Sequence, residues 1–368
     1  MGCVREIDGR DALARAQRDI RRLVYDRLPG WHAPPSFLEL DRFDRRSEPF
    51  WESHEGQVFV HEESGRVTAR ILATISKGGA QTGHFGLFDS ADDPEPAGAV
   101  VRAAGRWLAA RGAKRMEGPY FLSIHEEVGL LVDGFEVPSA IYMPYSAPHA
   151  ARLLEGLGFT AIRSFGTYRY DLDSCYDAAV AAGADRPDIA VRGFDRSRES
   201  DEIRNLLAVY NSAFAGNWGF TPLSDRAGRA MVKNLLTIGD SELVRIAETD
   251  GRPIGFIMCV PDVNDFLHSI KGWPGFTKIP ALLAAIFLRR IRNTRVITLA
   301  VVKELQGQGI SRVLIRSLAS NARSRGYRNA ELSYIDTENH WMNRLMRGYN
   351  FRSQKEYRIY GRDLPFDR

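Results

Sequence analysis

The stretch from Arg295 to Phe351 constrains this chain more than any other segment, because a strand, a turn with two glycines and a helix follow one another in it. A β-branched run at positions 296–301 predicts the strand, and apolar residues at positions 313, 314, 318 and 322 predict the helix. Gly307 and Gly309 lie in the turn, where successive backbone N–H groups can point into one concave space. The helix adds the positive end of its dipole. We therefore expect the turn to bind an anion, for which a phosphate group is a natural ligand.

The spacing within this turn separates it from two common phosphate-binding motifs. It matches neither the GxxxxGK[ST] of P-loops nor the GxGxxG of dinucleotide-binding folds. It matches Gln-x-x-Gly-x-small through Gln306, Gly309 and Ser311, and a second predicted strand at 330–335 is followed by Asn339 and Phe351. This combination resembles the pyrophosphate-binding region of the GNAT superfamily of CoA-dependent N-acyltransferases.

The resemblance implies a set of cofactor-binding residues that starts in the strand and continues through the turn. The strand residues would line the pantetheine, one backbone N–H would stabilise the oxyanion, and the turn would hold the pyrophosphate. The implied co-substrate is acyl-CoA or an acyl-carrier-protein thioester, with no metal. The residues are Leu299, Ala300, Val301, Gln306, Gly307, Gln308, Gly309, Ile310, Ser311 and Asn339.

Length and composition limit the remaining classes. The 368 residues suffice for two domains, and a net charge of +4 does not call for nucleic acid. Cys3, Cys175 and Cys259 are far apart without a CxxC pair, which argues against disulfides and zinc and favours a reducing cytoplasm. The first residues contain no apolar signal core, and no apolar run approaches the roughly 20 residues that span a bilayer. We expect a cytoplasmic protein without a transmembrane segment.

The order of predicted elements repeats once along the chain. Both halves show a hairpin, a strand, a helix, a strand and a helix, which indicates a tandem repeat of one fold. We expect an α/β (α+β) protein of two GNAT-like domains, each a mixed, mostly antiparallel sheet flanked by helices. The first would span 1–173 and the second 189–368, joined by an Ala-, Asp- and Gly-rich linker at 174–188.

The two halves differ where the phosphate should bind. The corresponding turn of the first half, 89–95, carries the carboxylates of Asp89, Asp92, Asp93 and Glu95, which would repel a pyrophosphate. We therefore expect only the second half to bind the thioester, with the first domain degenerate.

Nearly the whole chain also resembles bacterial tandem GNAT-like proteins that include the ceramide synthases. The matching segments include 118–135, 217–220, 261–264 and 331–334. The resemblance implies transfer of an acyl group from a thioester to an amine, which is a sphingoid base for the ceramide synthases. The chain departs from the pattern at 146–150, which reads Ser-Ala-Pro-His-Ala where such proteins tend to have Asn-Pro-Pro-Tyr-Tyr. It also has Met346 in place of the usual thiolate-protonating tyrosine.

The chemistry requires a neutral amine, so a carboxylate should accept a proton directly or through water. Glu127 and Asp262 are the candidates. Tyr334 or Tyr349 could replace the missing acid, or the thiolate could leave unassisted. Four residues are candidates for substrate binding, against the structural alternatives of loop capping, turn capping and wall packing: Ser123, His125, Trp218 and Asn264.

An insertion at 265–295 precedes the predicted strand at 296–301. Its apolar part, 279–288, predicts either a lid over a long acyl chain or a packed helix, and its arginines either contact phosphates and anionic lipid or are solvated. The predicted activity is N-acyl transfer of a medium or long chain to a small-molecule or lipid amine, with an acyl carrier protein as a candidate partner and peripheral membrane contact compatible with it. The alternatives are a short-chain acetyltransferase acting on a small polar amine and a non-catalytic acyl-CoA-binding protein.

Overall fold

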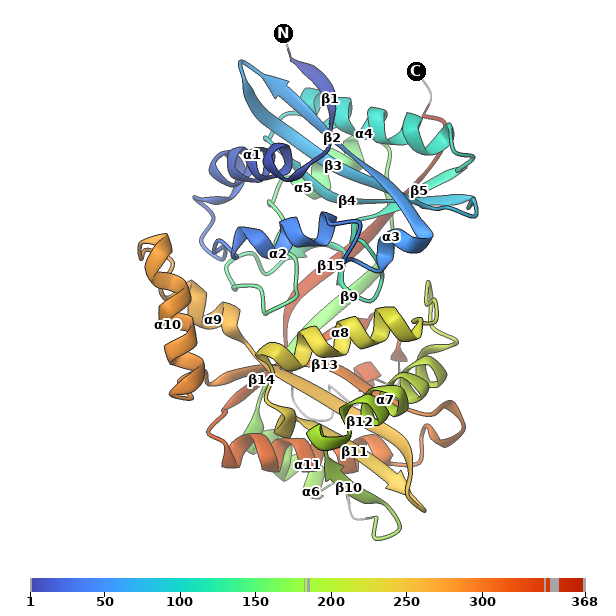
Figure 1. The fold of residues 1–368 in the computed structure, drawn as a ribbon, viewed down its shortest axis with the longest axis vertical. Coiled ribbons are helices and arrows are strands. Elements are labelled where there is room, and N and C mark those ends of the chain that lie inside the picture. The colour runs from blue at the N-terminus through green and yellow to red at the C-terminus, as the bar shows by residue number, and fades with distance from the viewer. Residues whose placement is uncertain (1, 182, 184–185, 341, 345–350, 367–368) are drawn as a thin grey trace. The chain divides into compact units, whose positions relative to one another are not determined.

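The computed structural model describes residues 2–181, 183, 186–340, 342–344 and 351–366 and divides into two compact units. The first unit contains Met1–Gly166, Leu267–Lys271 and Gln354–Arg368, and the second contains Thr167–Phe266 and Gly272–Ser353. The division falls inside strand β9 (Thr160–Asp171) and near the start of strand β15 (Arg352–Asp363), so each of these strands contributes to both units (Figure 1).

The first unit contains a mixed sheet in the order β1-β2-β3-β4-β5-β15, with β8 also paired to β15. All neighbours are antiparallel except β4 and β5, which are parallel. The remaining strands are β1 (Cys3–Ile7), β2 (His54–Glu63), β3 (Arg66–Ser76), β4 (Thr82–Ser90), β5 (Arg115–Gly118), β6 (Tyr120–Phe121), β7 (Glu127–Val128) and β8 (Leu130–Asp133). The helices are α1 (Arg10–Ile20), α2 (Ser36–Leu40), α3 (Phe50–Ser53), α4 (Pro94–Ala109) and α5 (Ala150–Gly156).

Strand β3 shows why this sheet carries helices on both faces. Side chains alternate between the faces of a strand, and every residue of β3 from Ala69 to Ile75 is buried. Ile71 and Ile75 belong to the core formed with α4, whereas Leu72 belongs to a second core formed with α1. The central strand is therefore buried on both sides.

The second unit contains a mixed sheet in which β14, β13, β12, β11 and β10 follow one another, with β9 beside β14. Only β13 and β14 are parallel among the pairs whose register is described. The strands are β10 (Ala190–Gly193), β11 (Val244–Thr249), β12 (Arg252–Pro261), β13 (Asn293–Val301) and β14 (Asn329–Asp336). The helices are α6 (Leu172–Ala181), α7 (Glu199–Phe214), α8 (Asp225–Ile238), α9 (Val263–Ser269), α10 (Gly275–Phe287) and α11 (Ile310–Ser324). A mixed sheet flanked by helices in each unit confirms the predicted fold class.

The segment expected to be a linker is helical over much of its length. Helix α6 extends to Ala181, because Leu172, Cys175 and Ala179 recur at helical spacing and are buried in the core that α11 shares. The Ala- and Asp-rich composition suggested a linker and concealed this apolar face. The extents 1–173 and 189–368 stay predictions for the two GNAT-like domains. The two compact units are defined by which residues pack together, and they exchange segments that the repeat in the sequence does not.

A buried ion network stabilises the first unit beside β4. The guanidinium of Arg70 donates to Asp89 at 2.7 Å and to Glu39 at 2.6 Å, and the hydroxyl of Tyr25 donates to Asp89. Burial alone would lower the pKa of Arg70, but the carboxylates of Glu39 and Asp89 raise it above its ordinary value. Asp89 therefore balances a buried charge and is not part of an open acidic turn.

We expect Asp89→Ala to lower the free energy of unfolding by roughly 3–5 kcal/mol, because it leaves the buried Arg70 charge incompletely balanced. The matched control is Asp92→Ala, which breaks an exposed ion pair with Arg152 and should change stability by about 0–1 kcal/mol. Urea unfolding of both variants measures the difference. Equal transition midpoints would show that the network contributes little.

Candidate functional site

The turn before α11 has the geometry of an anion site. Gly307 and Gly309 adopt φ of +78° and +86°, a left-handed conformation that side chains disfavour, and no described atom lies within 4 Å of a Cβ built on either. Helix α11 begins with no side-chain cap among the described residues. The N–H of Arg312 already donates to the carbonyl of Gly309 at 3.0 Å. The N–H groups of Ile310 and Ser311 come too early in the helix to reach a carbonyl of it, so they and the helix dipole are available to an anion.

Side chains outside the turn hold it in place. The amide of Gln306 donates to the carbonyl of Ala213 at the end of α7 (3.2 Å) and to that of Val301 at the end of β13 (3.0 Å). Gln306 is thus a positioning residue for the turn. Arg186 donates to the carbonyl of Gln308 at 2.6 Å and pairs with Asp188. Sequence analysis missed Arg186, because it lies in the expected linker and its partner is distant in sequence.

Strands β13 and β14 separate beside this turn. Their parallel pairing runs from Asn293↔Asn329 to Val296↔Leu332, yet β13 continues to Val301 and β14 to Asp336. On its other edge β13 stays paired with β12 up to Val301. The segment 297–301, which includes the predicted residues Leu299, Ala300 and Val301, therefore lies where the parallel ladder has ended and leads directly to the turn.

A buried polar cluster lies next to the point where the ladder ends. Arg295 is only 4% exposed and donates from Nε to the hydroxyl of Ser333 at 3.0 Å. Its guanidinium lies 5.8 Å from the ring centroid of Tyr334, and its parallel partner across the ladder is Glu331, also buried. Its burial contradicts the expectation that Arg295 belongs to a solvated basic end. An Arg and a Glu at facing strand positions were the signal that could have revealed the cluster.

Two predicted residues of the second unit act as local caps. Asp262 is buried at the end of β12, and its Oδ1 accepts from the N–H of Asn264 at 3.2 Å, at the start of α9. Asn339 accepts from the N–H of Met342 at 3.0 Å. The bond of Asp262 matches the capping alternative. Tyr349 and Met346 lie outside the described residues.

The loop of the first unit holds the other predicted residues. Ser123 accepts from the N–H of His125 at 3.3 Å, and Glu127 lies in β7, opposite Phe121. Glu126 pairs with Arg42; burial raises the pKa of Glu126 to about 7, although Arg42 acts in the opposite direction. Ser123, His125 and Glu127 thus belong to the first unit, and all other predicted site residues that are described belong to the second.

Trp218 lies in a turn at 217–220 that α7 holds. The amide of Asn211 makes two hydrogen bonds with the backbone of Leu223, at 3.0 and 3.1 Å. Phe220 packs against the rings of Tyr210 and Phe214. These contacts fix the loop on α7. The backbone N–H of Lys303 also donates to the hydroxyl of Ser212 on α7, at 3.4 Å.

The corresponding region of the first unit is closed. Strands β4 and β5 also separate early, after His84↔Glu117, but β6 fills the space, and a Cβ on Gly86 would collide with the carbonyl of Tyr120. Helix α4 begins with the carboxylate of Asp93 accepting from the N–H of Glu95 at 2.9 Å, followed by a proline that has no N–H. A carboxylate already occupies the place of an anion, which supports the expectation that this half binds no pyrophosphate.

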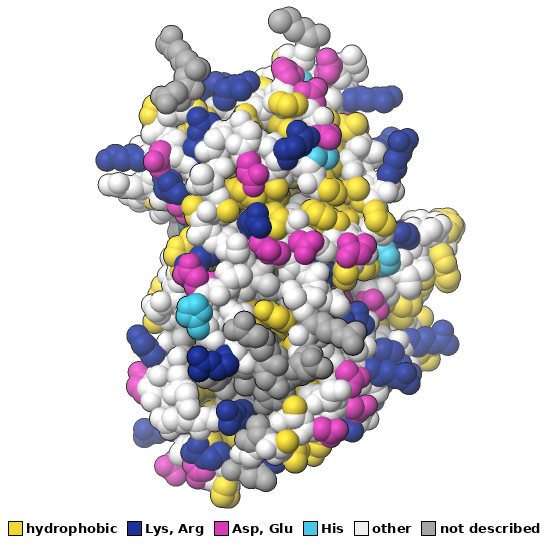
Figure 2. All heavy atoms as spheres, turned by 180° about the vertical axis from the view of Figure 1, so that it is seen from behind, with side chains coloured by type: hydrophobic (Ala, Val, Ile, Leu, Met, Phe, Trp, Pro, Cys, Tyr) yellow, Lys and Arg dark blue, Asp and Glu magenta, His cyan; other side chains and the backbone are white. Residues whose placement is uncertain are grey.

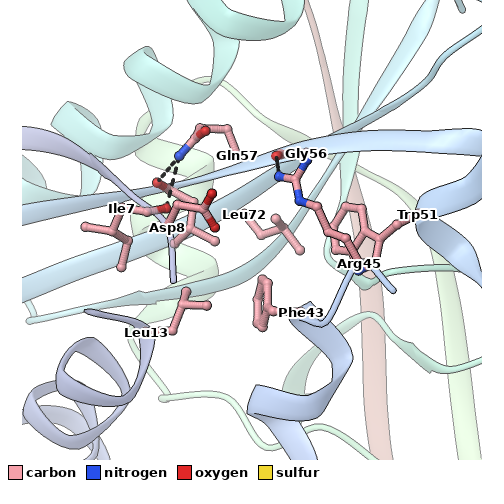
Figure 3. Close-up of a pocket in the computed structure, with 10 residues that line it drawn as sticks. Ile7, Asp8, Leu13, Phe43, Arg45, Trp51, Gly56, Gln57 and Leu72 are labelled. Carbon is pink, nitrogen blue, oxygen red and sulfur yellow. Dashed lines mark hydrogen bonds between the residues drawn. The ribbon is translucent and has the colours of Figure 1, made fainter. Parts of the chain in front are cut away.

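A small cavity in the first unit does not offer a second site. It lies among β1, β2 and α1, lined by Leu13, Phe43, Trp51 and Leu72 on its apolar side, and Figure 3 shows Arg45 and Gln57 directed to backbone atoms. Its volume of about 10 Å³ is room for one water molecule.

Within the described ranges, no cluster of three or more His, Cys, Asp or Glu could hold a metal ion. No described helix combines the length and apolarity needed to cross a bilayer.

Comparison with known proteins agrees with this geometry. The Acetyltransferase (GNAT) family matches residues 203–351. A bacterial ceramide synthase of Caulobacter vibrioides is 30% identical over 353 residues, covering 91% of each chain, and the protein YghO of Escherichia coli is 30% identical over 356 residues, covering 93% of this chain and 90% of YghO. Among solved structures, a tandem GNAT protein from the clavulanic acid biosynthesis pathway superposes over the full length of both chains with a TM-score of 0.61 at 12% identity.

We expect Gly309→Glu to abolish CoA binding, because it places a side chain and a negative charge where the phosphate approaches. The matched control is Gly251→Glu, at a hairpin turn of the same unit with φ of +71° and equally open space. Calorimetric titration with CoA measures both affinities. Unchanged binding by the Gly309 variant would contradict the assignment of the turn.

Proposed function

The chain belongs to the GNAT acetyltransferase family and is an N-acyltransferase, and on that premise we propose that it is a cytoplasmic enzyme that transfers a medium- or long-chain acyl group to a lipid amine. The donor is a CoA or acyl-carrier thioester. The single observation that carries the binding of the thioester is the early end of the β13–β14 ladder beside a helix N-terminus that has no side-chain cap.

The shape of this opening suits a pantetheine thioester. The edge of β13 at 297–301 leaves the ladder, so the amides of pantetheine can pair with its backbone as an added strand would. The pyrophosphate then reaches the turn at 307–311, where the space beside Gly307 and Gly309 is open. The reacting carbonyl would lie towards the end of the ladder, where a backbone N–H of 299–301 stabilises the oxyanion.

The transfer itself needs one bond made and one broken. The neutral amine nitrogen attacks the thioester carbon, the C–S bond breaks, and the proton lost by nitrogen balances the charge of the departing thiolate. Asp262 or Glu127 accepts that proton directly or through water. Tyr334 lies in the first residues of β14 beyond the ladder, beside the Arg295 guanidinium, which supports it as the proton donor to sulfur. Tyr349 is the alternative donor.

The lipid character of the acceptor rests on the similarity to the bacterial ceramide synthase over 91% of the chain. Helix α10 lies in the insertion that precedes β13, but its outer apolar residues are exposed and do not line an enclosed tunnel. That observation favours a second candidate, transfer of a short acyl group such as acetyl to a small polar amine.

A donor series from acetyl to palmitoyl at fixed amine separates the two candidates. We expect kcat/KM to rise with chain length, because each buried methylene contributes roughly 0.8 kcal/mol, about fourfold. A maximum at acetyl would support the short-chain enzyme. Tight CoA binding without cleavage of any thioester, over a panel of amines, would instead indicate a non-catalytic binding protein.

We expect Tyr334→Phe to lower kcat by about a hundredfold or more, because it removes the phenolic proton while keeping the ring. Tyr327→Phe, at a half-buried tyrosine of the same unit, is the matched control and should leave kcat unchanged. Rates at saturating donor measure the effect. If Tyr349→Phe alone lowers kcat, the proton donor is Tyr349; if neither does, the thiolate leaves unassisted.

A further inference from the structure

Helix α10 is apolar on both its inner and its outer side, which is unusual for a helix at a protein surface. Ala285 on the inner side is buried. On the outer side Phe276 is 83% exposed, Leu283 62% and Phe287 85%, and these residues recur at the spacing of one helical stripe. We call the outer stripe the set that also includes the exposed neighbours Trp273, Ile279 and Leu288.

All the charged residues of the segment around the outer stripe are basic. Between Asp265 and Glu304 the sequence contains no Asp or Glu, although the whole chain holds 46 of them against 50 Lys and Arg. Arg289, Arg290 and Arg292 follow the end of α10, and all three are exposed. In Figure 2, apolar and basic side chains gather together at the right-hand edge, where the view from behind places α10.

We propose that the outer stripe inserts into the surface of an anionic membrane, with the arginines at 289–292 contacting lipid headgroups. Aromatic and aliphatic side chains on one face of a helix, next to Lys and Arg, form the pattern of helices that lie in the membrane interface. Anionic headgroups complement the charge, each nearby Lys or Arg adding attraction that salt weakens.

Two other occupants match the stripe less well. A second copy of the chain would bring one basic segment against another without acids to balance it, because none occurs between 265 and 304. An acidic protein would match the arginines, but the most exposed large apolar residues of the segment are two phenylalanines, whose burial calls for an apolar medium.

This membrane contact does not depend on the proposed reaction. It would, however, bring the second unit, which contains both α10 and the opening beside β13, to the surface in which a lipid amine dissolves. A lipid substrate could then enter without crossing bulk water.

Flotation of the full-length protein with vesicles tests the proposal. We expect binding to phosphatidylcholine vesicles that contain phosphatidylglycerol, weaker binding to pure phosphatidylcholine, and release as the salt concentration rises. The double variant Phe276→Ser/Phe287→Ser should lower the partition constant at least about tenfold, because each side chain loses an apolar environment. Arg289→Gln/Arg290→Gln should remove the preference for phosphatidylglycerol.

Matched variants on the first unit control for general surface effects. Phe37→Ser replaces a half-exposed phenylalanine, and Arg18→Gln/Arg22→Gln removes two exposed charges. We expect both to bind vesicles like the parent chain. Failure of the parent to bind, or equal binding by the Phe276/Phe287 variant, would overturn the proposal. So would sedimentation showing that this variant converts a dimer to a monomer, or loss of binding to an acyl carrier protein while vesicle binding persists.

Discussion

The early end of the parallel ladder between β13 and β14 is the constraint on which the second unit depends. Once two parallel strands part, each exposes backbone N–H and C=O groups that need partners from another source. In the first unit β6 lies in the corresponding space beside β4. In the second unit the segment 297–301 leads to a glycine turn instead, and this is where we propose that a thioester binds.

The same contrast explains how one fold can hold two different halves. A carboxylate at the start of α4 and a buried Arg70–Asp89 pair beside β4 satisfy charges within the first unit. At the start of α11, two left-handed glycines leave the helix dipole without an internal partner. The two halves therefore differ both in the residues at the start of this helix and in the presence of β6 beside β4.

Local patterns predicted the parts of this molecule that local physics determines. The spacing of Gln306 and Gly309, and the apolar period after them, predicted the turn and α11, because glycine conformation and helix amphipathicity are short-range properties. The Ala- and Asp-rich composition did not reveal α6, because the apolar face of this helix packs against α11. The run of arginines after position 288 did not reveal that Arg295 is buried, because its hydrogen-bond partner, Ser333, lies in another strand. Side-chain roles that depend on distant partners, such as those of Gln306 and Arg186, were beyond sequence reasoning for the same reason.

The pairing of β15 with β5 has a consequence for how the chain is made. Tyr360 in β15 pairs with Gly118 in β5, so the first unit cannot complete its sheet until the chain has been synthesised beyond the second unit. During translation β5 presents an open edge, the kind of surface on which chains aggregate, while the second unit is being built. Contacts so distant in sequence also slow folding. The order of events is therefore the reverse of the order of the halves: the part made first is finished last, and a nascent chain that stalls before residue 354 has no strand with which to close it.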